Sequence, residues 1–172
     1  GAQALKLQTY TADTITLDVK EGEFFIADED SLWKGKSLYE LYMEAYTPWE
    51  WHEPIMKRAN ELGMLCFSTP FDDTAVDYLE DLNVPAYKIA SGDLKNIPLI
   101  KHVAAFGRPM VISTGGGTLE DVQRVYESVL PINPQLSFLQ CTASYPCDFA
   151  KLNLRVIETF RTNFPDIVIG LS

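Results

Sequence analysis

The feature that most constrains this fold is a regular alternation of short apolar runs with segments that carry helix signals. Six runs have the length and composition of strands, and they span residues 4–10, 64–69, 86–91, 109–114, 136–142 and 167–172. A helical stretch follows each of the first five runs. Strands that alternate with helices indicate repeated βαβ units and therefore a parallel sheet. The runs are almost continuously apolar, which is typical of a sheet covered by helices.

Capping residues predict where two of these helices start. Thr47, Pro48 and Glu50 offer an N-cap, a proline at the first helical position and a capping-box acid. Thr118 and Asp121 form a weaker capping box before a later helix. Both signals agree with the positions that the alternation assigns to helices.

Two architectures fit this alternation, a (β/α)8 TIM barrel and a doubly wound open sheet. Polar residues end the expected strands, at Gln8, Thr69, Ser91, Ser113, Thr142 and Ser172. In a barrel those ends form the rim on which active sites are built, whereas an open sheet gathers functional residues at one switch point. We therefore expect a TIM barrel. Because six strands cannot close an eight-stranded barrel, residues 1–172 are expected to be one incomplete catalytic domain.

Charge and composition exclude several classes of function. The net charge of −10 argues against non-specific binding to nucleic acid or to an anionic membrane, since both need a basic surface. No apolar run approaches the roughly 20 residues of a membrane span, and no signal peptide is visible. The odd number of cysteines, Cys66, Cys141 and Cys147, favours a reducing compartment. We expect a cytoplasmic protein with neither a nucleic-acid nor a membrane partner.

The stretch VPAYKIASGD places a lysine, Lys88, inside a strand that is expected to be buried. Burying an unpaired ammonium costs several kcal/mol, so an anion is expected beside it. Lys6 and Gln8 are two residues apart in the first strand and share one of its faces. Together with hydroxyls at strand ends, such as Ser91 and Ser113, the two lysines predict a pocket for a small, multiply charged anion.

Two segments each allow two interpretations. The glycine-rich turn at residues 113–118 has backbone N–H groups that suit a phosphate, yet glycines also serve the geometry of βα loops. The long acidic segment at residues 10–36 is either a lid or substrate wall, or a solvated hairpin.

Other residues with chemical potential have ordinary structural explanations. His52 and His102 fall in helical stretches, where we expect solvated or half-buried side chains. No spacing of histidines and acids predicts a metal ligand within these residues. An aromatic group is expected to pack an extra helix pair or, alternatively, to form a sugar-stacking surface, and it comprises Trp33, Trp49, Trp51, Tyr39, Tyr42 and Tyr46.

Seven motifs in one order resemble the sialic acid synthase family, also called the nonulosonate synthases. They are GAQALKLQTY, CFSTPFDDTAVDYLEDLNVPAYKIASGD, NIPLI, GRPMVISTG, LQCTASYP, LNLRVI and IVIGLS. The resemblance covers essentially the whole chain and implies barrel strands two to seven of that family. The first strand with its catalytic glutamate, the last strand and a C-terminal antifreeze-like domain are then expected outside residues 1–172.

The resemblance implies a condensation of phosphoenolpyruvate with the open-chain aldehyde of an N-acetylated hexose. The product is a nine-carbon 2-keto sugar acid, and phosphate is released. A divalent metal, Mn²⁺ or Mg²⁺, is expected in the full-length protein, which is expected to be a homodimer. The family's metal histidines follow the position of Ser172, so we expect no metal ligand here and an inactive isolated fragment.

The resemblance also implies roles for individual residues. Lys88, Lys6 and Gln8 are expected to be catalytic, with Lys88 beside Thr69 at the carboxylate of phosphoenolpyruvate and the other two near its phosphate and the sugar. Residues expected to bind the phosphate are Ser91, Ser113 and Ser172, and those on the sugar side are Asp93 and Tyr145. The sequence departs from the family at Asp93, where a glutamate is usual, and at Ala143, where some members carry an amide.

The identity of the sugar is divided between two branches of the family. SLWKGKSLYELYMEAYTPWEWH resembles the pseudaminic acid synthases, whereas KIASGD resembles the N-acetylneuraminic acid branch. We favour pseudaminic acid because the longer segment is expected to shape the sugar side. Two other functions stay open, a class I aldolase-like barrel lyase in which Lys88 forms a Schiff base, and a non-catalytic sugar- or phosphate-binding module.

Overall fold

The computed structural model describes residues 1–144 and 147–172, and each predicted run overlaps one strand of a single sheet. The strands are β1 (Ala4–Thr9), β2 (Leu65–Pro70), β3 (Tyr87–Ile89), β4 (Met110–Ser113), β5 (Leu136–Gln140) and β6 (Val168–Leu171). The α-helices are α1 (Ala12–Ile15), α2 (Leu38–Ala45), α3 (His52–Glu61), α4 (Asp73–Asp81), α5 (Ile97–Ala105), α6 (Leu119–Val129) and α7 (Val156–Asn163). Four 3₁₀ turns are η1 (Gly22–Phe24), η2 (Trp49–Trp51), η3 (Ser91–Asp93) and η4 (Phe149–Lys151).

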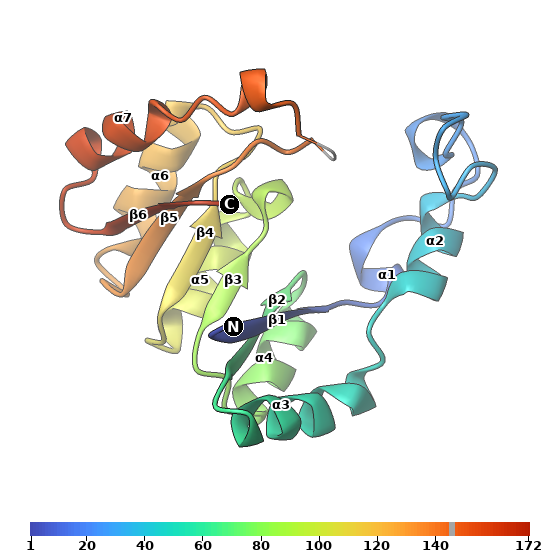
Figure 1. Ribbon diagram of the computed structural model, residues 1–172, viewed down its shortest axis with the longest axis horizontal. Helices are drawn as coiled ribbons and strands as arrows, with labels where there is room; N and C mark the ends of the chain where they lie inside the picture. The colour runs from blue at the N-terminus through green and yellow to red at the C-terminus, as the bar shows by residue number, and fades with distance from the viewer. Residues whose placement is uncertain (145–146) are drawn as a thin grey trace.

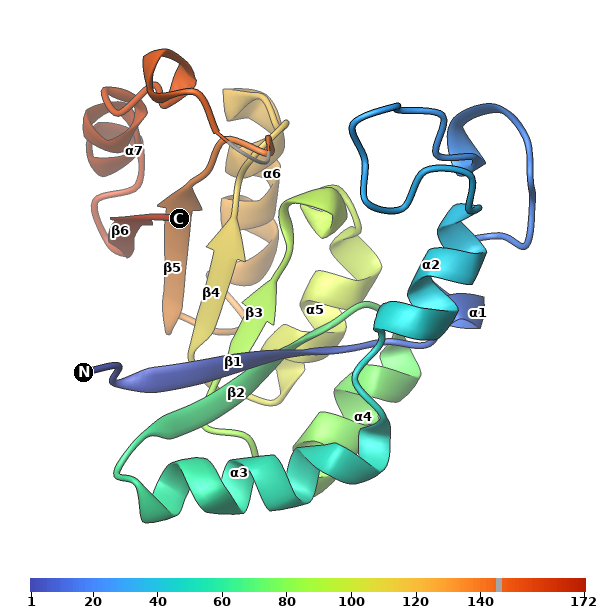
Figure 2. The same cartoon turned by 45° about the vertical axis from the view of Figure 1, so that its right-hand side comes forward.

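The order of the strands decides between the two predicted architectures. All neighbouring strands are parallel, and their order in the sheet is β1-β2-β3-β4-β5-β6, the same as in the chain. A doubly wound sheet would reverse direction at a switch point, and this sheet does not. It curls strongly, with α3 to α7 along its outer side (Figures 1 and 2). The arrangement is that of an incomplete (β/α)8 barrel, as expected.

The hydrophobic core fills the layer between the outer face of the sheet and these helices. Ile89, Ile112 and Phe138 lie at matching positions on three neighbouring strands, and none of them is exposed to solvent. Helix residues such as Val103 and Val125 cover them and are equally buried. Full burial of one such side chain contributes about 1.5–3 kcal/mol. Since side chains alternate along a strand, the residues between these face the inside of the curl.

The two predicted helix starts have different outcomes. Thr118 and Asp121 form the predicted capping box at the start of α6, with hydrogen bonds of 3.0 to 3.2 Å. The start predicted at Thr47 is wrong, because Pro48 has an extended ψ of 133° and leads into the 3₁₀ turn η2. The α-helix begins only at His52.

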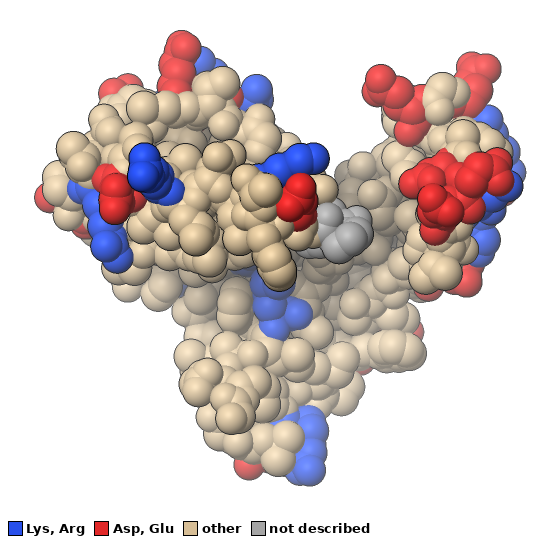
Figure 3. Space-filling model, turned by 45° about the horizontal axis from the view of Figure 1, so that its top comes forward, with Lys and Arg blue, Asp and Glu red and all other residues tan. Residues whose placement is uncertain are grey.

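The acidic segment at residues 10–36 contains a hairpin-like turn that extends away from the sheet (Figures 1 and 2). Ile26 donates its N–H to the Lys36 carbonyl at 3.0 Å, and Gly35 donates to the Ile26 carbonyl at 2.9 Å. The exposed acids of the segment are Asp13, Asp18, Glu21, Glu23, Asp28, Glu29 and Asp30. Figure 3 shows acidic side chains gathered on this projecting part. The hairpin interpretation is therefore supported, and a lid function stays a prediction.

The aromatic residues support the packing interpretation rather than one continuous stacking surface. Trp49 stacks on Tyr78 with ring centres 4.7 Å apart, and Tyr42 meets Tyr10 edge-on at 5.5 Å. Trp51, by contrast, is 55% exposed.

Within the described part of the chain, no helix has the length and apolarity needed to cross a membrane.

Candidate functional site

A cavity of about 260 Å³ lies where the C-terminal ends of the six strands converge inside the curl. We call it the Lys88 cavity. Its lining residues are Lys6, Gln8, Thr69, Lys88, Ala90, Ser91, Gly92, Ser113, Cys141, Ala143 and Ser172. Every strand, or the residues directly after it, contributes to this wall. Figure 3 shows basic atoms in the recessed centre of this face.

The cavity brings together seven of the nine residues that the sequence predicted for the site. Asp93 is the first of the other two, because it lies half-buried in η3 and does not line the cavity. Burial raises the pKa of its carboxyl, and a hydrogen bond with Asn96 opposes that change. Tyr145 is the second, and it lies outside the described residues.

Lys88 is the most constrained residue of the cavity. It is 6% exposed, and its Nζ donates to the Ile89 carbonyl at 2.7 Å and to Ser113 Oγ at 2.5 Å. None of the ion pairs among the described residues includes it. Burial, and then the positive charge of Lys6, lower the pKa of Lys88 to about 8, while Cys141 acts in the opposite direction. An anionic ligand would stabilise this ammonium.

Two serine hydroxyls beside Lys88 are arranged as hydrogen-bond donors. Ser113 Oγ accepts a hydrogen bond from Lys88 Nζ, and Ser91 Oγ accepts one from the Gly115 N–H at 3.0 Å. Each hydroxyl keeps its own proton to donate. Two hydroxyl donors and two lysines around one small cavity provide the charge and the donors that a phosphate or carboxylate requires.

The glycine-rich turn supports this wall through its shape. A side chain at Gly115 would place its Cβ 2.9 Å from Ser91 Oγ and 3.0 Å from the Cys141 carbonyl. Gly116 has a φ of +73°, which L-residues rarely adopt. The N–H of Gly115 is bonded to Ser91, and that of Gly117 to the Thr114 carbonyl at 3.1 Å. The structure therefore favours the geometric interpretation of the glycines over a phosphate cradle.

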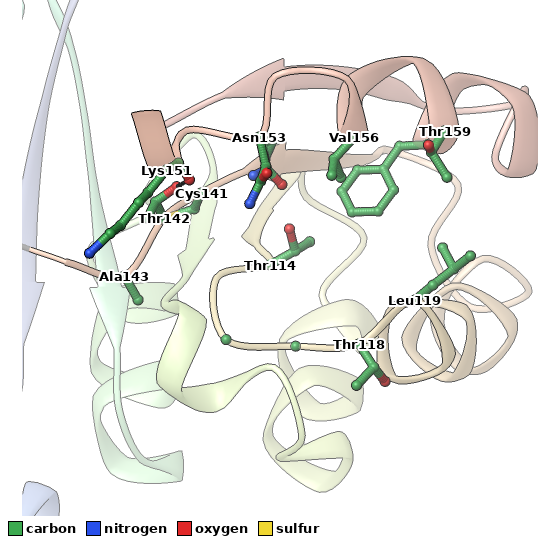
Figure 4. A pocket seen from close by; sticks show the side chains of 14 residues that line it. Thr114, Thr118, Leu119, Cys141, Thr142, Ala143, Lys151, Asn153, Val156 and Thr159 are labelled. Atoms are coloured by element: carbon green, nitrogen blue, oxygen red, sulfur yellow. Dashed lines mark hydrogen bonds between the residues drawn. The ribbon is translucent and has the colours of Figure 1, made fainter. Parts of the chain in front are cut away.

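A second cavity, of about 350 Å³, lies beyond the glycine-rich turn, and sequence reasoning did not identify it. In Figure 4, Thr114 and Thr118 lie on one side of it, while Asn153 and Val156 lie on the opposite side. It shares the wall residues Cys141 and Ala143 with the Lys88 cavity. Asn153 in its wall has a φ of +49°, in the left-handed region that asparagine adopts more readily than most residues.

The prediction of a solvated or half-buried histidine is wrong for His52 and confirmed for His102. His52 is completely buried because it faces β1 and β2, where its Nε2 lies 2.7 Å from Thr9 Oγ1. The side chain of His102 is 31% exposed and contacts Asp73 and Asp77 at 2.8 and 3.0 Å.

Known proteins agree with this fold. The model of the NeuB family matches residues 1–172. The chain belongs to the NeuB family. It is 39% identical, over 173 aligned positions that include all of this chain, to the pseudaminic acid synthase of Campylobacter jejuni. It is 42% identical over 121 positions, or 70% of this chain, to the human N-acetylneuraminate-9-phosphate synthase.

The fold of this NeuB chain matches a solved structure of a sialic acid synthetase from Leptospira borgpetersenii. The TM-score is 0.85 at 24% identity, and the match covers 99% of this chain and 54% of the solved one. The chain spans 50% of the Campylobacter relative and 34% of the human relative.

The described residues of this NeuB chain do not form a set of metal ligands. Within residues 1–144 and 147–172, no group of three or more His, Cys, Asp or Glu side chains could hold a metal ion. We therefore derive no step of the reaction through a metal.

Proposed function

We propose that the protein containing this chain condenses phosphoenolpyruvate with the open-chain aldehyde of an N-acetylated hexose, releasing phosphate. The observation that carries the proposal is Lys88, a buried ammonium with no acidic partner among the described residues, beside two hydroxyl donors and a second lysine. Phosphoenolpyruvate has a carboxylate and a phosphate close together, so it matches a small cavity with several fixed donors. The names of the NeuB relatives support a sugar-acid synthase.

Each of the nine residues that the sequence predicted for the site has a role in this proposal. Lys88 and Thr69 hold the carboxylate of phosphoenolpyruvate, and Lys6 and Gln8 lie between its phosphate and the sugar. The phosphate is bound by Ser91, Ser113 and Ser172, while Asp93 and Tyr145 are assigned to the sugar side. Fixed donors stabilise charge as it develops in the transition state, a contribution that is usually the largest in catalysis.

The proposed reaction forms one carbon–carbon bond and replaces the C2–oxygen bond to phosphate with a C2–oxygen bond from water. C3 of the enol ester attacks the aldehyde carbon, and the aldehyde oxygen gains a proton. Water then adds at C2, which has become cationic. The resulting tetrahedral intermediate expels phosphate and leaves a 2-keto acid of nine carbons.

The proposal includes a specific sugar, a metal and an assembly. We favour the pseudaminic acid precursor over the N-acetylneuraminic acid precursor because residues 31–52 resemble the pseudaminic branch. The Campylobacter relative of that name also matches along the whole chain. A divalent cation, Mn²⁺ or Mg²⁺, bound by residues outside these 172, a homodimer and a cytoplasmic location complete the proposal.

The test is phosphate release by the full-length protein with phosphoenolpyruvate and a panel of N-acetylated hexoses, with the product identified by mass spectrometry. We expect a 2-keto acid nine carbons long, and the panel identifies the preferred sugar. Absence of release with every sugar would refute the condensation. If phosphoenolpyruvate then still bound, the protein would be a binding module.

A pKa of about 8 at Lys88 also suits a Schiff-base lysine, so the aldolase-like alternative needs its own assay. Borohydride reduction in the presence of a keto substrate would attach that substrate to Lys88 if this alternative were correct. Under the condensation mechanism, we expect no adduct.

A further inference from the structure

We infer that His52 is a positioning residue for the Lys88 cavity and acts through Thr9 and Ser68 on the strand ends that carry Gln8 and Thr69. The inference rests on the proposed function, because it concerns the geometry of the same cavity. His52 does not line the cavity, and it approaches the strands from their outer side.

Three buried polar side chains form a hydrogen-bonded series. His52 Nε2 lies 2.7 Å from Thr9 Oγ1, and the same hydroxyl lies 2.7 Å from Ser68 Oγ. Solvent reaches at most 1% of each of these residues. Buried polar groups are costly unless they are bonded, so the three side chains hold one another in place.

Only one neutral form of the His52 ring satisfies all the hydrogen bonds of this group. His52 Nδ1 lies 3.4 Å from the Pro48 carbonyl, an acceptor, so Nδ1 must carry the proton. Nε2 then accepts from the Thr9 hydroxyl, and Thr9 accepts from the Ser68 hydroxyl. Burial lowers the pKa of His52, which favours a neutral ring over a charged one. Every donor in the chain therefore has an acceptor.

The three hydrogen-bonded side chains are connected to the Lys88 cavity through the backbones of β1 and β2. Thr9 follows Gln8 in β1, and Ser68 precedes Thr69 in β2. Gln8 and Thr69 are paired in the register of the two strands, and both line the Lys88 cavity. Successive side chains point to opposite faces of a strand, so the outer hydrogen bonds fix the inner pair.

Among the described residues, no other side-chain hydrogen bond joins the side chains of Thr9 and Ser68 to the helical layer. The ring of Tyr78 packs edge-on against His52 at 5.6 Å, an apolar contact. Trp49 Nε1 of η2 also donates to the carbonyl of Tyr10, directly after β1, at 3.3 Å, but His52 is the side chain that connects this layer to both Thr9 and Ser68. A shift of about 1 Å in a positioned group can lower a rate about 100-fold.

The test compares three variants of the full-length protein, each assayed below its own melting temperature. His52→Leu removes the acceptor, His52→Gln retains one at the position of Nε2, and Val125→Ala is a buried change in α6, away from the cavity. We expect His52→Leu to raise KM for phosphoenolpyruvate and lower kcat/KM by about 10- to 100-fold. The kcat/KM of His52→Gln should return to within about threefold of wild type. Val125→Ala should lose about as much stability as His52→Leu, yet leave KM and kcat/KM unchanged.

Unchanged KM and kcat in His52→Leu, or equal losses in the Leu and Gln variants, would overturn the inference. If the wild-type protein neither binds nor turns over phosphoenolpyruvate, the proposed function fails instead. The positioning role is then judged by NMR, because His52→Leu should shift the backbone amides of Gln8 and Thr69 whereas His52→Gln should restore them. Unshifted amides would refute it.

Discussion

Replacing Lys88 with methionine should stabilise the fold at neutral pH while abolishing the binding of phosphoenolpyruvate. The pKa of Lys88 lies at about 8 in the folded protein, against 10.5 for the free side chain. At about 1.4 kcal/mol for each pH unit, the charged form is destabilised by about 3 kcal/mol relative to the neutral form. Loss of the amine's two hydrogen bonds, about 1 kcal/mol each, offsets part of the gain in Lys88→Met.

The sign of the pH dependence follows from the depressed pKa. Below about pH 8 the lysine is charged in both the folded and the unfolded state, so wild type carries the full penalty. Between about pH 8 and the unfolded value of 10.5, the unfolded state holds the extra proton, so the free energy of unfolding of wild type rises with pH. The stability advantage of Lys88→Met should therefore shrink by about 3 kcal/mol over this window.

The assay is urea unfolding of both proteins across this pH range without ligand. Other titrating groups cancel in the difference between wild type and variant. Lys57→Met, at an exposed lysine of α3, is the matched control and should show a constant difference. A Lys88→Met difference that does not change with pH would show that Lys88 is not a desolvated ammonium, and the main argument for an anion site would fail.

Three further predictions concern other parts of the structure. Phosphoenolpyruvate affinity, measured by calorimetry, should fall about tenfold per pH unit above about pH 8 as free Lys88 loses its proton, and a flat profile would contradict the role of its charge. Gly115→Ala should destabilise the fold by about 1–3 kcal/mol in chemical unfolding because its Cβ meets a hydroxyl at 2.9 Å, whereas Gly92→Ala, with nothing within 4 Å, should cost less. The pKa of His102 is raised, first by its hydrogen bond to Asp73. His102 should therefore add under about 1 kcal/mol to the free energy of unfolding. This contribution should be complete below the pKa of the unfolded state and lost as pH rises through the pKa of the folded state. Replacing His102 with Gln should abolish that pH dependence, and a loss of stability toward low pH instead would be the wrong sign.

The strands and most of the site were predictable because both depend on local patterns. Apolar runs of strand length mark the sheet, and polar residues at their ends mark the rim of the cavity. The register that pairs Gln8 with Thr69 was less predictable, because aligning the first residues of the two predicted runs, 4 and 64, would pair Gln8 with Ser68. The cost of burying the charge of Lys88 was the basis for predicting an anion site beside it.

What the sequence could not predict depends on how distant elements meet. His52 lies on a helix with few apolar residues, and its burial depends on which side of α3 contacts β1 and β2. Thr47 precedes a proline whose extended backbone overrides the capping pattern. Asp93 follows the strand end closely, yet the turn η3 leaves it outside the cavity wall. The second cavity depends on the paths of residues 140–143 and 151–160, which no periodic pattern specifies.

The side chains proposed to bind the anion come from the ends of five strands, β1, β2, β3, β4 and β6, whereas the segment proposed to set sugar preference, residues 31–52, lies in the connection between β1 and β2. Strand ends are fixed by the sheet register, while a connection can lengthen or change sequence without disturbing it. Under the proposed function, evolution could thus exchange one acceptor sugar for another by changing that connection, while the residues proposed to bind phosphoenolpyruvate stay the same. A laboratory graft of the same segment between homologues should follow the same route.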